Sequence, residues 1–153
     1  GLMITPDGPK VIEYNCRFGD PETQVVLPLL ESDLLTVMQA VTEEKLSDIE
    51  VKFSDKNACC VIMASKGYPE SYGKGYPIKI GESVKDNVYV AGAALKDGQV
   101  VTAGGRVLGV TAIGDTLENA INASYEMVQE IKFENAYYRR DIGARALKAP
   151  GVK

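Results

Sequence analysis

The feature that most constrains the fold is the apolar run ACCVIMAS at residues 58–65. It is far shorter than the ~20 residues that a membrane-spanning helix needs, and no apolar run elsewhere in the chain approaches that length. A continuous apolar run of this size is typical of a strand that is buried on both faces. Such a strand requires apolar cover, which the sequence offers in the segment DTLENAINASYEMVQEI at residues 115–131.

Residues 115–131 are the clearest helix in the chain. Asp115 and Glu118 fit a variant of the capping box at its start. The helix and the apolar run can bury each other, so the region from about residue 50 onward is expected to fold independently. Residues of one helical face recur at Leu117, Ile121, Ser124, Val128 and Ile131.

Other segments predict antiparallel strands and a second, shorter helix. The dipeptide Asp97-Gly98 lies between two apolar stretches, which indicates a β-hairpin. The Gly-, Pro- and Tyr-rich segment at residues 66–77 predicts a loop. A helix is expected at residues 32–46, where Ser32 or Asp33 can cap it. Further strands are expected at residues 9–15, 49–53 and 106–114.

The composition of the sequence changes near residue 48, and this change predicts two structural units. Residues 1–48 read as a strand, a loop and a helix, a set too small to bury a core alone. Residues 49–153 read as a compact α+β unit in which one long helix covers antiparallel strands. The first unit is therefore expected to pack against the second unit or against upstream sequence. The chain opens at GLMITPDG, as if cut from something longer.

Composition excludes several classes of function. The chain has no histidine, which removes His-based acid–base catalysis, His triads and His-ligated zinc. The net charge of -4 gives no electrostatic basis for binding nucleic acid. The three cysteines form no metal or redox motif, and adjacent Cys59 and Cys60 would point to opposite faces of a strand. They indicate reduced thiols and a cytoplasmic protein.

The segment KVIEYNCRFGDPETQ at residues 10–24 carries the candidate chemistry. On a strand, Glu13 and Asn15 would share a face and present two hard oxygen ligands of the kind that Mg²⁺ binds together with phosphates and water. Arg17 follows with a planar fork suited to a phosphate or carboxylate. Asp20 and Glu22 could bind an ammonium group or tighten the loop. From spacing alone, a solvent-facing strand edge followed by a salt-bridged turn is the favoured interpretation, because E-x-N-x-R is a short and weak pattern.

Four stretches together resemble one enzyme family, in family order and over nearly the whole chain. The sequence resembles the carboxy-terminal part of glycinamide ribonucleotide synthetase, also called phosphoribosylamine–glycine ligase. This resemblance implies the end of an ATP-grasp domain, then a barrel-sandwich-like domain with an antiparallel sheet and one long helix. The matching stretches are VIEYNCRFGDPETQVVLPLLESDLL, VIMASKGYPESYGKGYPI, GGRVLGVTAIGDTLENAINASYEMVQEI and YYRRDIGARAL.

The resemblance also implies an activity and its partners. The family joins glycine to 5-phosphoribosylamine, using ATP to form a glycyl phosphate, in de novo purine synthesis. By this resemblance, Glu13 and Asn15 match ligands of the Mg²⁺ (or Mn²⁺) that holds the nucleotide phosphates. Arg17 is the implied catalytic residue beside the reacting phosphate, while Asp20 and Glu22 would bind substrate near the glycine ammonium. The chain alone is expected to be inactive, because it lacks the amino-terminal part of the family's enzyme. That missing part is expected to be one of its partners.

Two arginines further along the chain are implied to bind substrate. Arg106 follows Gly104-Gly105, which indicates either a tight turn or a close backbone approach to substrate. Arg140 lies in YYRRDIG, which is either a salt-bridged basic end or a contact for the phosphate of phosphoribosylamine. The family has polar residues at three nearby positions where this chain has the apolar residues Val90, Ala93 and Ala103. This difference puts in question the contribution of the carboxy-terminal part to the substrate site.

Two alternative interpretations stay open at this stage. One is a non-catalytic, barrel-sandwich-type module such as a biotin or lipoyl carrier. Lys96 does precede the hairpin turn, but no Met-Lys-Met motif occurs, which argues against a carrier. The other is the end of a different ATP-grasp carboxylate–amine ligase, which upstream sequence or substrate assays would distinguish.

Overall fold

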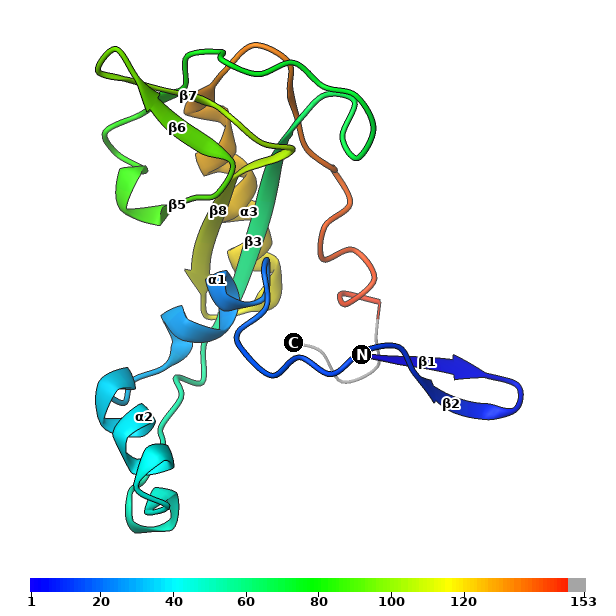
Figure 1. Cartoon of the computed structure of the whole chain (residues 1–153), viewed down its shortest axis with the longest axis vertical. Coiled ribbons are helices and arrows are strands. Elements are labelled where there is room, and N and C mark those ends of the chain that lie inside the picture. Colours follow the sequence, from blue (N-terminus) through cyan, green and yellow to red (C-terminus); the bar gives the residue numbers. More distant parts are fainter. Residues whose placement is uncertain (149–153) are drawn as a thin grey trace.

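The computed structural model of the chain describes residues 1–148, which form an elongated molecule with a β-hairpin projecting from one side (Figure 1). The helices and strands, in chain order, are β1 (Leu2–Thr5), β2 (Gly8–Val11), α1 (Thr23–Val26), η1 (Leu27–Leu29), α2 (Leu34–Thr42), η2 (Leu46–Asp48), β3 (Asn57–Ser65), β4 (Lys79–Ile80), η3 (Lys85–Asn87), β5 (Val88–Val90), β6 (Ala93–Lys96), β7 (Gln99–Thr102), β8 (Arg106–Gly114), α3 (Leu117–Gln129), β9 (Ile131–Lys132) and β10 (Ala136–Tyr137).

The centre of the fold is a four-stranded sheet with the order β10-β3-β8-β5. All three neighbouring pairs are antiparallel, and the long strands β3 and β8 pair along most of their lengths. The long helix α3 packs across both of these strands. The predicted α+β class, an antiparallel sheet with one long helix, is therefore confirmed.

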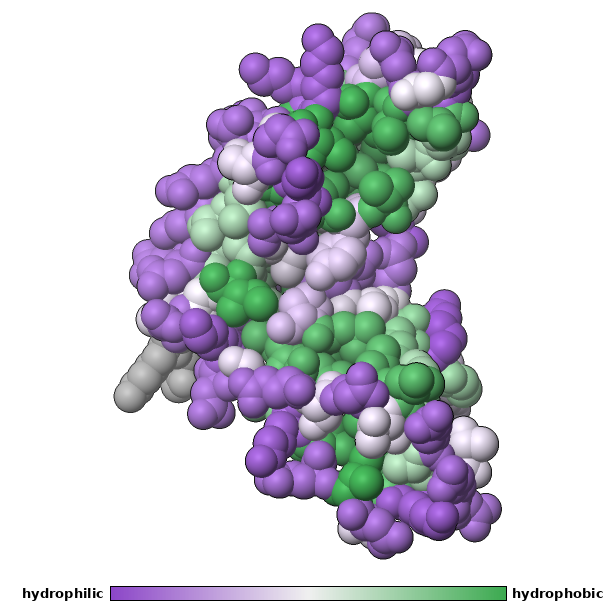
Figure 2. All heavy atoms as spheres, turned by 90° about the vertical axis from the view of Figure 1, so that its left-hand side faces the viewer, coloured by the Kyte–Doolittle hydropathy of each residue, from purple (hydrophilic) through white to green (hydrophobic). Residues whose placement is uncertain are grey.

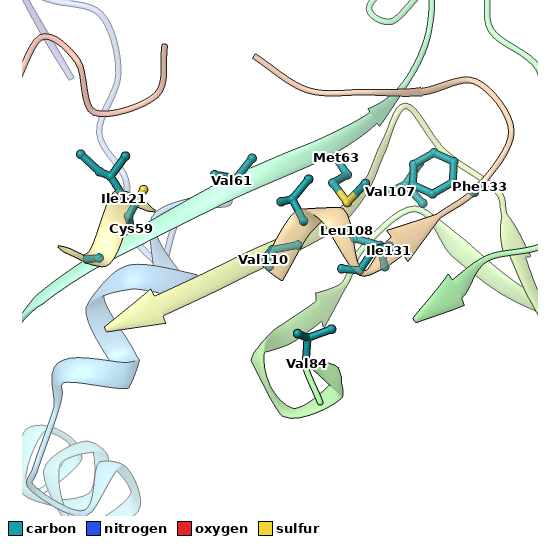
Figure 3. Packing of buried hydrophobic residues seen from close by; sticks show 12 residues of the cluster. Cys59, Val61, Met63, Val84, Val107, Leu108, Val110, Ile121, Ile131 and Phe133 are labelled. Atoms are coloured by element: carbon teal, nitrogen blue, oxygen red, sulfur yellow. The ribbon is translucent and has the colours of Figure 1, made fainter. Parts of the chain in front are cut away.

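The core lies between α3 and one face of the sheet (Figure 3). Alternate residues of a strand share a face, so Cys59, Val61 and Met63 of β3 point towards α3. The opposite face is only half-covered, and Cys60 and Ile62 on it keep partial exposure. The expectation of a strand buried on both faces was thus right for one face only. Fully buried partners on the helix side include Leu108, Val110, Ala120 and Val128.

Helix α3 begins one residue later than the capping-box pattern suggested. The side-chain oxygen of Thr116, not that of Asp115, accepts a hydrogen bond from the backbone N–H of Asn119 at 3.1 Å. Thr116 has the extended backbone that an N-cap requires, so it satisfies an otherwise unpaired amide of the first turn. The predicted helical face is right, with Ile121, Ser124 and Val128 buried.

Helix α2 is shorter than predicted but has one of the expected caps. The carboxylate of Asp33 accepts from the backbone N–H of Thr36 at 2.7 Å, which lowers the pKa of Asp33. The helix ends at Thr42, and Glu44 then takes a φ of +59°. A left-handed residue cannot continue an α-helix, so the chain turns there instead of reaching residue 46.

Two of the predicted strands are wrong: one is shorter than expected and the other does not form. The first does not run from residue 9 to 15, because β2 ends at Val11, where it pairs with Leu2 at the start of β1. Glu13 and Asn15 therefore lie in irregular backbone, without a ladder of their own. Residues 49–53 form no strand either; Phe53 makes an isolated bridge to Leu30.

The predicted hairpin and strand around Asp97-Gly98 are confirmed. Strands β6 and β7 pair antiparallel with Lys96 opposite Gln99. Asp97 and Gly98 both have positive φ, +49° and +77°, as a two-residue hairpin turn requires. Residues 66–77 form the expected loop, and β8 at Arg106–Gly114 matches the predicted strand.

The packing of α1 and η1 bears on the predicted division at residue 48. The division itself remains a prediction, but α1 and η1, which precede it, pack against β3, which follows it. Apolar side chains also gather in two areas of one face, with a hollow between them (Figure 2). Within residues 1–148, no helix combines the length and the apolar character that crossing a membrane requires.

Amide hydrogen exchange is expected to separate the sheet from the hairpin. Slow amides should lie in β3, β8 and α3, because these elements bury one another. Residues 1–15 should exchange fast, because β1 and β2 pair only with each other in the described sheets. Exchange followed by mass spectrometry or NMR checks this, and uniformly fast exchange in β3 and α3 would contradict independent folding.

The buried hydroxyl of Ser124 is expected to stabilise the fold. It accepts from the backbone N–H of Ala112 at 3.1 Å and donates to the carbonyl of Cys59 at 2.7 Å, joining α3 to both long strands. Ser124→Ala removes both of these hydrogen bonds from a buried site, so we expect a loss of about 2 kcal/mol in the free energy of unfolding. Urea denaturation measures it. The control Asn122→Ala, on the exposed side of α3, should change stability by less than about 0.5 kcal/mol.

Candidate functional site

A polar cavity of about 290 Å³ lies between the loop after β2 and the start of β8. It brings together six of the seven predicted site residues, and only Arg140 lies outside it. Five of the six belong to the single loop between β2 and α1, while Arg106 comes from the start of β8. The lining residues are Glu13, Asn15, Arg17, Gly19, Asp20, Pro21, Glu22 and Arg106.

The loop owes its shape to a turn at Gly19. The carbonyl of Gly19 accepts from the backbone N–H of Thr23 at 2.9 Å, which starts α1 immediately after the loop. A Cβ at position 19 would meet the carboxylate of Glu22, which would then have to move, so glycine leaves room for Glu22 over the turn. Glu22 thereby folds back over the turn and stays at the cavity.

Glu13 and Asn15 both line this cavity. The amide oxygen of Asn15 accepts from Nη1 of Arg17 at 3.0 Å, and a carbonyl oxygen has a second lone pair available for a metal. The described part of the chain contains no cluster of three or more Cys, Asp or Glu side chains arranged to hold a metal ion. One carboxylate and one amide oxygen fit an ion such as Mg²⁺, which takes its remaining ligands from phosphates and water.

Asp20 is held from two sides. Arg106 donates from Nη1 to the backbone carbonyl of Asp20 at 2.8 Å, and its Nη2 lies 3.5 Å from the Asp20 carboxylate. Gln24 donates from Nε2 to the other carboxylate oxygen at 2.7 Å. Sequence reasoning missed Gln24. The available signal was its position four residues after Asp20, at the spacing of neighbours on a helix surface.

Arg140 does not reach the polar cavity. Its guanidinium lies 5.9 Å from the centre of the Tyr138 ring. Neighbouring Arg139 makes two hydrogen bonds to the carboxylate of Asp141, at 2.9 and 2.7 Å, and these lower the pKa of Asp141. A salt-bridged basic end, one of the two interpretations of YYRRDIG, describes this arrangement. The substrate contact of Arg140 stays a prediction.

The glycines before Arg106 serve internal packing. A Cβ on Gly104 would collide with the backbone of Gly92, and a Cβ on Gly105 would collide with the ring of Tyr68. This favours the tight-turn interpretation over a close backbone approach to substrate. Ala103 donates from its backbone N–H to the carbonyl of Gly92 at 2.8 Å. The three positions that depart from the family pattern, Val90, Ala93 and Ala103, do not line the polar cavity.

A second cavity, of about 360 Å³ and mainly apolar, lies on the other side of Arg106. Arg106 lines both cavities and thus forms part of the wall between them. The other lining residues come from β3, the 66–77 loop and the segment after β9: Ile62, Ala64, Tyr68, Tyr137, Tyr138, Arg139 and Ile142.

Two family models match the chain. One, described as "Phosphoribosylglycinamide synthetase, C domain", matches residues 58–145, more than half of the sequence. The chain belongs to the phosphoribosylglycinamide synthetase family. The other model, for the ATP-grasp (A) domain of the same synthetase, matches residues 1–23, which include Glu13, Asn15 and Arg17. These matches favour the ligase family over a carrier module or a different ATP-grasp ligase.

Relatives of this family match nearly the whole chain. A phosphoribosylamine–glycine ligase of Caldanaerobacter subterraneus is 52% identical over 145 residues, 94% of this chain and 35% of the relative. A trifunctional purine biosynthetic protein of Gallus gallus is 54% identical over 151 residues, 96% of this chain and 15% of the relative. The chain thus spans about a third or less of the length of these curated relatives.

A solved structure supports the same assignment. The crystal structure of the phosphoribosylamine–glycine ligase of Thermotoga maritima is 36% identical in sequence and superposes with a TM-score of 0.74. It covers 93% of this chain, which corresponds to 35% of that structure. The predicted fold class, the end of an ATP-grasp domain followed by the family's carboxy-terminal domain, is therefore confirmed.

The three thiols are expected to differ in reactivity. Cys16 is exposed, Cys59 is buried and Cys60 is half-buried. Burial raises the pKa of Cys59 and Cys60, and the charge of Asp20 adds a smaller upward contribution at Cys60. At pH 8 a disulfide reagent should modify Cys16 at least about tenfold faster than the other two, because only the thiolate reacts. Urea should equalise the rates; equal rates in the folded chain would contradict the burial of β3.

Proposed function

We propose that the chain is the carboxy-terminal part of an ATP-dependent ligase that joins glycine to 5-phosphoribosylamine through a glycyl phosphate, in de novo purine synthesis. The observation that carries the proposal is the polar cavity, which gathers Glu13, Asn15, Arg17, Glu22 and Arg106 in a chain of this family. The names of the relatives support this activity for the longer protein. The enzyme would act in the cytoplasm.

Glu13 and Asn15 would hold Mg²⁺ (or Mn²⁺) against the phosphates of ATP. When bound, the ion neutralises charge on a transferring phosphoryl group, and catalysis of this kind is mainly positioning and electrostatics. The carboxylate of Glu13 supplies the charge. The amide oxygen of Asn15 supplies a neutral ligand, oriented by its hydrogen bond from Arg17.

Arg17 and Glu22 would serve the reacting groups. Arg17 gives one donor to Asn15, and a guanidinium has five, so further donors remain for the phosphoryl group or the glycyl phosphate. Glu22 has no basic partner among the salt bridges of residues 1–148, so its carboxylate is suited to the ammonium of glycine. We keep Arg140 as a candidate for the phosphate of phosphoribosylamine, presented by a segment outside the polar cavity.

The experiment that tests the proposal joins this chain to the upstream part of the Caldanaerobacter relative. The joined protein should convert ATP, glycine and phosphoribosylamine to ADP, phosphate and glycinamide ribonucleotide in the presence of Mg²⁺. The 153-residue chain alone should give no product above a blank. An inactive joined protein that is folded by circular dichroism and binds ATP would count against the proposed function. Robust turnover by the chain alone would show that no upstream part is needed.

Glu13→Gln is expected to impair catalysis more than folding. The change keeps the size of the side chain but removes the charge that would hold the metal. We expect kcat/KM to fall about 100-fold, which corresponds to about 2.7 kcal/mol of transition-state stabilisation, with partial recovery at high Mg²⁺. Steady-state kinetics across a Mg²⁺ titration, beside thermal melts, measures both effects.

The matched control is Glu126→Gln on the exposed side of α3, which should leave the kinetics unchanged. Near-wild-type turnover of Glu13→Gln at low Mg²⁺ would rule out the metal role. The segment would then be a solvent-facing loop that only supports the structure.

A further inference from the structure

Gln24 occupies an unusual position at the base of the polar cavity. It lies in the first turn of α1, and its stem packs over β8, where a Cβ on Gly109 would approach Cγ of Gln24 to 3.7 Å. Its Nε2 donates to Asp20 at 2.7 Å. The amide orientation follows from chemistry, because an ionised carboxylate only accepts hydrogen bonds.

The other end of the Gln24 amide is unsatisfied. Its Oε1 is buried and makes no hydrogen bond in the structure. A buried acceptor without a partner destabilises a folded protein, and an apolar side chain of the same length would avoid this cost. Fold stability alone therefore gives little reason for an amide at this position, whereas the hydrogen bond to Asp20 does give one.

Asp20 connects Gln24 to the opposite wall of the cavity. Arg106 contacts both the backbone carbonyl and the carboxylate of Asp20, so three residues form one chain of interactions from α1 to β8. Both carboxylate oxygens of Asp20 have a protein partner. Arg106 and Asp20 are 41% and 48% exposed, so their ion pair adds little stability and is suited to orientation.

We propose that Gln24 is a positioning residue of the ligase. Acting through Asp20, it fixes the turn of residues 19–22 and the guanidinium of Arg106 beside the polar cavity. Asp20 is then the shared acceptor of Gln24 and Arg106 and not a ligand of the glycine ammonium, which leaves Glu22 for that contact. The inference rests on the proposed function, and it replaces the substrate role that the resemblance implied for Asp20.

The test is Gln24→Met in the joined, full-length ligase. Methionine keeps the stem over Gly109, removes the donor to Asp20 and removes the unsatisfied oxygen. We expect kcat/KM for glycine to fall about tenfold, in line with the loss of a hydrogen bond to a charged group. The melting temperature should stay within about 2 °C or rise. KM for MgATP should change less than about twofold, because Gln24 makes no hydrogen bond to Glu13 or Asn15 within residues 1–148.

A double-mutant comparison tests whether Gln24 acts through Asp20. In an Asp20→Ala background, Gln24→Met should have no further effect on kcat/KM, because the residue that it positions is gone. The matched control Gln39→Met, on the exposed side of α2, should leave both kinetics and melting unchanged. Wild-type kinetics for Gln24→Met, a melting loss that parallels the kinetic loss, or full additivity with Asp20→Ala would each overturn the inference.

NMR of the 153-residue chain separates this inference from the proposed function. The side-chain amide resonances of Gln24 should respond to Asp20→Asn, because this variant removes the charged acceptor of the Gln24 Nε2 hydrogen bond. If the joined wild-type protein makes no product while the Gln24 resonances respond, the proposed function fails and the contact stands. If the resonances do not respond to Asp20→Asn, the positioning role fails whatever the activity.

Discussion

The antiparallel pairing of β3 with β8 is the constraint on which the rest of the structure depends. Their register places Val61 opposite Val110 and sends both towards α3, and a slip of one residue would turn the apolar side chains of one strand away from the core. Ser124 ties the helix to both strands at the same level. The same register determines where β8 begins, and therefore where Arg106 stands.

The candidate site lies beside this strand pair but is held together by weaker interactions. Its loop lacks regular structure, and its contacts to the sheet are half-exposed hydrogen bonds and one ion pair. Interactions of this kind contribute little to stability, yet they fix geometry. Binding groups on loops that a rigid scaffold positions are common in proteins, since a loop can turn several polar side chains towards one cavity. Arg106 links the two parts across 86 residues of sequence.

Family membership and structure together explain the uneven surface. The segment that matches the ATP-grasp model ends in the polar cavity, and its β1–β2 hairpin exposes Leu2 and Ile4, at 64% and 77%. The Caldanaerobacter relative and the Thermotoga structure are about three times as long as the matched region. An isolated two-stranded hairpin is at best marginally stable in water, so these side chains are suited to cover by further protein.

The sequence by itself determined the features that depend on local chemistry: the apolar strand at 58–65, the one-sided helix, the turn at Asp97-Gly98 and a helix cap at Ser32 or Asp33. Its motifs also indicated the residues of the polar cavity. Only the tertiary structure decided that β2 stops at Val11, that Thr116 caps α3, and that Gln24 and Arg106 meet at Asp20. A strand ends where its partner ends, and a side chain from a distant element is placed by packing, so neither is encoded in the residues nearby.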